Sequence, residues 1–270
     1  MTAAVELVDA GLSVVKRDFR LFVSYRLRLG TMLLSAFFSL TLFYYISRLV
    51  NVPQFTTHEQ YYAFALIGLI ILQVVNSTLQ TPPTTLRQEL VAGTFERIVL
   101  SPFGPVGAVI SMLVFPFLLT LVMAAAMLVF ASLAFGAPVH WGTAPAAIPV
   151  ACLASLAFAP FGLAFLAGVL VVKQAIAGAT WVVAGISLIA GLYFPIALLP
   201  DWIEWTSNVQ PFTPAVDLMR HLLVGTPLSY SAWLDVLKIV GFAAVLFPIS
   251  AWLVARAVRA SRRRGTIIEY

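Results

Sequence analysis

The sequence is poor in charged residues and almost free of cysteine. Only 10% of its 270 residues are Asp, Glu, Lys or Arg, while 61% are hydrophobic; an average soluble domain carries about 25% charged residues. So few charges cannot cover the surface of a soluble protein of this length, and so much hydrophobicity excludes a disordered chain. The single cysteine, Cys152, excludes a disulfide-stabilised secreted scaffold. A polytopic membrane protein remains.

Several catalytic motifs are also missing. The chain has three lysines, Lys16, Lys173 and Lys238, and none follows a glycine, so a P-loop for ATP is excluded. There is no His-Glu-x-x-His motif and no second cysteine, so we expect neither a bound metal nor a cofactor. The long uncharged runs hold no carboxylate for a proton or sodium relay, which argues against a gradient-driven carrier, although backbone carbonyls can also hold sodium. An intramembrane enzyme would lack an acid–base pair.

Long uncharged runs define the expected fold. The run Ile98–Val172 has 75 residues, which suits two spans of about 20 residues and a turn, and the Gly/Pro cluster at 136–142 supplies that turn. The runs are continuous rather than alternating, so helices are expected and not barrel strands. We therefore predict an all-α integral membrane protein with six transmembrane helices in a domain over 30–255. The expected spans are about 30–50, 61–80, 103–135, 146–172, 174–197 and 235–256.

Basic residues predict the orientation. With the N-terminus in the cytoplasm, thirteen of the 16 Lys and Arg residues fall inside, and only Arg48, Arg220 and Lys238 fall outside. This bias follows the positive-inside rule and predicts that both termini are cytoplasmic. The net charge of +5 thus reports topology and lipid contact, and we expect no nucleic-acid partner. The first run begins about 29 residues from the start, which does not fit a cleaved signal peptide.

The segment 1–29 has the pattern of an amphipathic helix. Apolar residues recur at steps of three and four, and Asp9, Ser13, Lys16 and Arg20 form the opposite face. Such a helix lies along the inner leaflet with its basic residues near lipid headgroups. It is either a plain surface anchor or part of a docking site for a partner. At the other end, the basic segment 256–270 is expected to be a cytoplasmic tail that clamps the inner headgroups.

Two segments outside the spans carry turn signals. In the cytoplasmic elbow 82–102, Pro82 and Pro83 can open a helix and Gly93 with Thr94 can end it, which predicts two short helices joined by a turn; the alternative is a solvated loop. In the extracellular segment 200–225, Pro200 can start a short helix and a second can run from Pro214 to Gly225. These helices are too short to span, so we expect re-entrant elements that form a lid or gate.

Two motifs in these segments resemble a known family. The elbow sequence GTFERIVLSP at 93–102 is similar to the cytoplasmic motif of exporter-type ABC transporter permeases, the type-2 membrane domains. The sequence FPIALLP at 194–200, followed by Trp202 and by PFTPAVDLMR at 211–220, resembles the signature before their last span. The resemblance covers essentially the whole chain. It implies a subunit in the cytoplasmic membrane of a prokaryote, without enzymatic activity of its own, that exports a substrate.

The resemblance also implies partners and site residues. It implies a second permease chain, identical or related, and a separate ATPase subunit that binds the ATP and Mg²⁺. The elbow would be the coupling helix, with Arg87, Glu89, Gly93, Thr94, Glu96 and Arg97 as candidate ATPase contacts. The extracellular gate would include Phe194, Pro195, Pro200, Trp202, Pro211 and Arg220, although the prolines could simply mark helix ends. The substrate path would lie at the dimer interface.

The substrate is less well specified. The 211–220 sequence resembles that of drug and lipid-like exporters, which favours a hydrophobic or amphipathic substrate; the alternative is a lipid-linked polysaccharide or glycolipid. Aromatic residues of the first two spans could line such a channel, although aromatics also flank most membrane interfaces. These candidates are Phe37, Phe38, Tyr44, Tyr45, Tyr61 and Tyr62. Outside the family, a gradient-driven secondary transporter and a membrane scaffold for a partner remain alternatives.

Overall fold

The computed structural model describes residues 2–50, 55, 57–94, 104–172 and 175–264. Within these residues the chain forms helices joined by short turns, and no strand is present, as the hydropathy pattern predicts. The helices are α1 (Thr2–Ser24), α2 (Arg26–Leu49), α3 (His58–Leu79), α4 (Thr81–Val91), α6 (Gly104–Phe135), α7 (Ala144–Val172), α8 (Ala175–Ile189), α9 (Asp201–Asn208), α10 (Phe212–Val224) and α11 (Ala232–Arg264), with a 3₁₀ turn at Ile196–Leu198.

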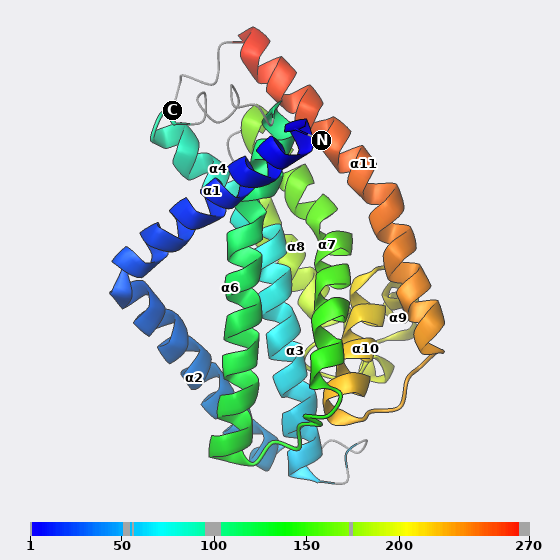
Figure 1. Ribbon diagram of the computed structural model, residues 1–270. Helices are drawn as coiled ribbons and strands as arrows, with labels where there is room; N and C mark the ends of the chain where they lie inside the picture. The colour runs from blue at the N-terminus through cyan, green and yellow to red at the C-terminus, as the bar shows by residue number, and fades with distance from the viewer. Residues whose placement is uncertain (1, 51–54, 56, 95–103, 173–174, 265–270) are drawn as a thin grey trace.

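Five helical segments of the described chain are long and apolar enough to cross a membrane. They lie within α2, α3 with α4, α6, α7 and α11. In Figure 1, α3 and α6 run side by side, α2 and α11 lie on opposite flanks, and α1 and α4 lie at the end where the chain termini are found. Most expected spans coincide with these helices to within a few residues.

The fifth expected span, 174–197, is shorter than predicted. Its helix, α8, has 15 residues and is therefore about 22 Å long, less than the roughly 30 Å of a bilayer core. The chain turns after it at Gly191, whose φ is 69°, a conformation that glycine adopts most readily. The apolar run continues through this turn, so hydropathy alone overestimates the helix. Six membrane crossings therefore stay a prediction.

The ends of the chain also differ from the expected boundaries. The expected segment 1–29 is divided, because α1 ends at Ser24 and α2 begins at Arg26 after a break at Tyr25. The last expected span, 235–256, is part of α11, which runs on to Arg264. Residues 256–264 of the predicted tail are thus helical, while 265–270 lie outside the described residues.

α3 and α4 form a nearly continuous helical segment with a break at Gln80. Pro82 and Pro83 at the start of α4 have no N–H, so the carbonyls of Thr78 and Leu79 lose their helical donors. Gly162 of α7 packs against this point; a Cβ there would lie 2.1 Å from the Thr78 carbonyl oxygen. The backbones of α3 and α7 therefore approach closely, and the elbow leaves the end of α3 in a fixed direction.

α7 is the central packing element. It contacts α3, α4, α8, α10 and α11, and buries the small residues Ala147, Ala151, Ala154 and Ala157. Small side chains let membrane helices approach without a gap. Phe158 on the same helix stacks on Phe212 of α10, with ring centroids 4.4 Å apart. The short helix α10 is thereby held against the bundle.

α10 ends as the sequence predicts but begins earlier. Its C-cap is Gly225, in the left-handed conformation with a φ of 72°. The helix begins at Phe212, two residues before the expected start at Pro214. A proline fits the first turn of a helix as well as its first position, so Pro214 does not fix the boundary. α10 packs on α3, α7 and α11, whereas α9 is mostly exposed.

Candidate functional site

The elbow ends in a well-defined helix stop. Gly93, with a φ of 66°, donates its N–H to the Leu90 carbonyl at 3.1 Å, and Thr94 donates its N–H to the Glu89 carbonyl at 3.0 Å. These two bonds form a Schellman motif, so the predicted role of Gly93 and Thr94 in ending the helix is confirmed. The Thr94 hydroxyl also donates to the Glu89 carboxylate. The predicted contacts Glu96 and Arg97 lie outside the described residues.

The exposed surface of the elbow is at the end of α4. Arg87, Val91, Ala92 and Gly93 are all exposed, and Val91 keeps 64% of its surface accessible. The opposite side of α4 is anchored, because Leu86 and its neighbours pack against α7 and α11. The structure thus presents a firmly held helix end at the side of the bundle where the termini lie (Figure 1).

α1 is joined to the elbow by an ion pair. A guanidinium nitrogen of Arg17 lies 3.5 Å from a carboxylate oxygen of Glu89 and 2.9 Å from one of Asp18. α1 also packs on α6, where Phe22 and Phe115 have ring centroids 5.7 Å apart. The N-terminal helix is therefore in direct contact with both the elbow and the bundle.

Arg220, one of the candidate gate residues, is buried. It keeps only 4% of its surface accessible. Its Nη2 donates to the carbonyls of Gly191 at 2.8 Å, Leu192 at 3.1 Å and Phe64 at 3.4 Å, and its guanidinium lies 3.3 Å from the centroid of the Phe64 ring. Arg220 therefore fastens α10 to α3 and to the turn after α8.

The other candidate gate residues differ in exposure and flank short helical elements. Trp202 is 74% exposed, Phe194 is half-buried, and three prolines flank short helical elements. Pro195 precedes the 3₁₀ turn, Pro200 precedes α9 and Pro211 precedes α10. Their positions are those of helix boundaries, the alternative that the sequence leaves open, and a gating role stays a prediction.

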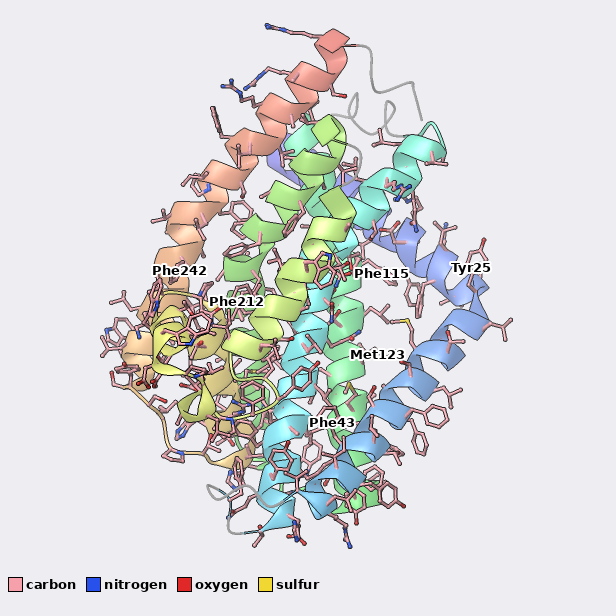
Figure 2. All side chains as sticks on the ribbon, turned by 180° about the vertical axis from the view of Figure 1, so that it is seen from behind. Tyr25, Phe43, Phe115, Met123, Phe212 and Phe242 are labelled. Atoms are coloured by element: carbon pink, nitrogen blue, oxygen red, sulfur yellow. The ribbon has the colours of Figure 1, made fainter. Side chains whose placement is uncertain are left out.

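The six candidate channel aromatics do not form one surface. Phe37, Phe38 and Tyr45 are exposed on α2. Tyr44 and Tyr62 pack on Phe135 of α6, with ring centroids 4.5 and 5.8 Å away, and Tyr62 keeps only 2% of its surface accessible. Tyr61 contacts Phe55. Tyr44, Tyr62 and Phe135 thus form a packed cluster, and Figure 2 shows Phe43 and the other side chains of this part of the bundle.

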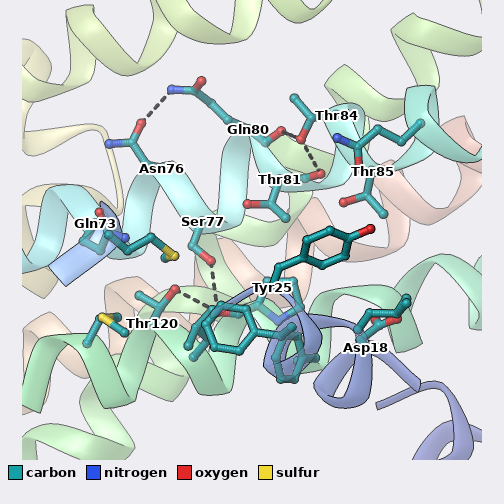
Figure 3. Close-up of a pocket in the computed structure, with 18 of the residues that line it drawn as sticks. Asp18, Tyr25, Gln73, Asn76, Ser77, Gln80, Thr81, Thr84, Thr85 and Thr120 are labelled. Carbon is teal, nitrogen blue, oxygen red and sulfur yellow. Dashed lines mark hydrogen bonds between the residues drawn. The ribbon is translucent and has the colours of Figure 1, made fainter. Parts of the chain in front are cut away.

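A cavity of about 650 Å³, which sequence reasoning missed, lies between α1, α2, α3, α4 and α6. Figure 3 shows its polar wall, formed by α3 and α4. Hydroxyl and amide side chains recur there at helical spacing: Gln73, Asn76, Ser77, Gln80, Thr84 and Gln88. This spacing puts them on one helix face, and such a polar stripe within an apolar run is the signal that could have revealed the cavity.

No metal centre is evident in the described part of the chain. The described residues contain no group of three or more His, Cys, Asp or Glu side chains that could hold a metal ion. Cys152 is a free, half-buried thiol on α7.

Comparisons with known proteins give the family. No curated protein matches the chain with significance. A family model described as ABC-2 type transporter matches residues 11–224, well over half of the sequence. The match includes the elbow, the cavity and α10, and it agrees with the resemblance in the two motifs. The chain therefore belongs to the ABC-2 type transporter family and is a membrane permease of an ABC transporter.

Proposed function

We propose that this permease exports a hydrophobic or amphipathic molecule across the cytoplasmic membrane, driven by a separate ATPase chain. The single observation that carries the proposal is the family match over residues 11–224. The described helices support it, because several are long and apolar enough to span. In this arrangement ATP and Mg²⁺ bind to the partner ATPase. A second permease chain, identical or related, completes the membrane part, and both termini of each chain are cytoplasmic.

The exposed end of α4 is the proposed contact for the ATPase. Three features support this assignment: the exposure of Arg87 and Val91, the rigid stop at Gly93, and the anchoring of α4 on α7. A force applied to a firmly held helix end reaches the bundle, whereas a solvated loop would absorb it. The ion pair between Arg17 and Glu89 extends the same contact surface to α1.

Purification of the tagged chain from its own host in mild detergent tests the proposal. We expect a co-purifying chain with a P-loop and vanadate-sensitive ATP hydrolysis in the eluate. Recovery of this chain alone from several detergents, with no ATPase activity, would contradict it. The assay also opens the search for the substrate, because transported compounds are expected to stimulate ATP turnover.

A charge substitution in the elbow tests the coupling role. Arg87→Glu is expected to lower the yield of co-purified ATPase or to separate ATP hydrolysis from transport. Arg259→Glu, which changes an equally exposed arginine on α11, is the matched control. Equal behaviour of the two variants would show that the end of α4 is not the coupling contact.

A further inference from the structure

The cavity between the α1–α2 junction and α3 has the size of a ligand site. Its volume of about 650 Å³ lies within the roughly 300–1,000 Å³ of small-molecule pockets. It lies within one chain, near the end of the bundle that carries α1 and α4. All of its lining residues belong to the described part of the structure. The chemistry of its walls therefore indicates what it could bind.

The α3 part of the polar wall is uncharged. The charged residues that line the cavity are Arg17, Asp18 and Glu89, and Arg17 is within ion-pair distance of both carboxylates. All three lie on α1 and α4. The part of the wall that α3 supplies, around Gln73 and Asn76, consists of amides and hydroxyls. A charged headgroup would meet no counter-charge there, and its desolvation would be costly.

The amides of this wall have unused hydrogen-bonding capacity. Gln80 donates to the Asn76 side-chain oxygen at 2.6 Å, which leaves the Asn76 NH₂ and the Gln80 side-chain oxygen available. No hydrogen bond joins the Gln73 amide to any other described residue. The Thr120 hydroxyl, in contrast, donates to the Pro116 carbonyl at 2.8 Å. These amides are half-buried on the cavity wall, and a ligand rich in hydroxyl groups can both donate to them and accept from them.

The facing wall is apolar and belongs partly to α2. It includes Tyr25, Met32, Phe115 and Met123. The inner half of α2 stands away from the bundle, since Leu27 and Leu34 are 87% and 54% exposed, whereas Leu40 in its outer half is buried. Figures 1 and 2 show α1 and α2 meeting at a corner, at Tyr25, set apart from the central helices. An apolar surface thus continues from the cavity to the outside of the bundle.

We propose that this cavity binds the uncharged, hydroxyl-rich headgroup of an amphiphile, such as a glycosyl lipid, while the hydrocarbon tail lies along the inner half of α2. The polar wall supplies hydrogen bonds to the headgroup and the apolar wall accepts the tail. The identification of this amphiphile as the exported substrate rests on the proposed function; the binding itself does not. Binding and transport can therefore be tested separately.

Photo-crosslinking of the full chain in phosphatidylcholine nanodiscs tests the proposal. The probe is a glucosyl diacylglycerol with a diazirine near the sugar, and peptide mass spectrometry maps the labelled residues. Gln73→Leu and Asn76→Leu each replace an amide side chain with an apolar side chain of similar size. The matched control is Thr78→Val, because the Thr78 hydroxyl bonds to the Val74 carbonyl of its own helix and Thr78 does not line the cavity. Thermal midpoints confirm that each variant is folded, and Gln73→Ala or Asn76→Ala replaces a Leu variant that is not.

We expect labels on α3 and α6, displaced by unlabelled glucosyl diacylglycerol but not by phosphatidylglycerol. Loss of a neutral hydrogen-bonding side chain should weaken labelling by roughly fivefold, in both Leu variants and not in the control. Labels that avoid these helices, equal displacement by phosphatidylglycerol, or unchanged labelling of the variants would each overturn the proposal. ATPase co-purification is scored independently, so failure of the transport assignment and failure of this site give different results.

Discussion

The buried Arg220 supports the sharpest prediction. Arg220→Met keeps much of the side-chain volume but removes all three hydrogen bonds to the carbonyls of Phe64, Gly191 and Leu192. Two of these bonds are shorter than 3.2 Å, and the guanidinium also stacks on the Phe64 ring. A hydrogen bond to a charged group contributes about 1.5–3 kcal/mol, so we expect a loss of about 2–4 kcal/mol of folding free energy, after allowance for the desolvation of the charge that methionine avoids.

Thermal unfolding in detergent measures this loss. For a chain of this size each kcal/mol shifts the midpoint by about 2–4 °C, so Arg220→Met should lower it by roughly 5–15 °C. Arg220→Lys keeps the charge but lacks the planar fork and the ring stacking. Its thermal midpoint should therefore fall between those of the unmodified chain and of Arg220→Met. The reasoning would be refuted if Arg220→Met unfolded within about 2 °C of the unmodified chain, because Arg220 would then not fasten α10.

The remaining predictions concern the helix contacts and the charged groups. Gly162→Ala should lower the thermal midpoint, since its Cβ would lie 2.1 Å from the Thr78 carbonyl oxygen. Gly241→Ala, with open space around it, should leave the midpoint unchanged. Equal midpoints of the two variants would contradict the close approach of the α3 and α7 backbones. Glu89→Gln should change stability by less than about 1 kcal/mol, because the ion pair between Glu89 and Arg17 is partly exposed. The substitution should nevertheless weaken co-purification of the ATPase. An unchanged yield of ATPase would show that the ion pair is not part of the ATPase contact. Burial raises the pKa of Asp217, against the lowering effects of Ser229 and Arg220; protonation therefore favours the folded state, and the stability contribution of Asp217 should grow as the pH falls through its raised pKa. Asp217→Asn should remove that rise from stability measured against pH, and a profile unchanged by the substitution would contradict it.

Helix content was predictable because it depends on local sequence. Long uncharged runs give membrane helices, and Gly93 and Gly225 end α4 and α10 where the sequence indicates. The length of α8 was not predictable from hydropathy, since the turn at Gly191 lies within the same apolar run. The division of the N-terminal segment at Tyr25 was also missed, because no proline or glycine marks it.

The position of Arg220 depends on contacts far along the chain. The carbonyls that it binds are 28, 29 and 156 residues away, so no local pattern could show that it is buried. Counting basic residues treats every arginine as exposed and places Arg220 on the outer side, and the family resemblance then makes it a gate residue. The cavity was missed for a related reason: a stripe of amides and hydroxyls carries no charge, and composition counts it only as weakly polar.

The near-continuity of α3 and α4 has a mechanical consequence. Residues 58–91 are one stiff rod, interrupted only at Gln80, and the 22 residues of α3 alone extend about 33 Å. Near its far end the rod is pinned by Phe64 under Arg220 and by Gly68, whose backbone abuts the Leu192 carbonyl. Such a pin is a fulcrum: a tilt of about 5° would move the elbow end of α3, about 20 Å from the pin, through roughly 2 Å, and its first residues through only about 1 Å. The same tilt would widen or narrow the cavity along its polar wall, so movement of this single helix would couple the elbow to the cavity.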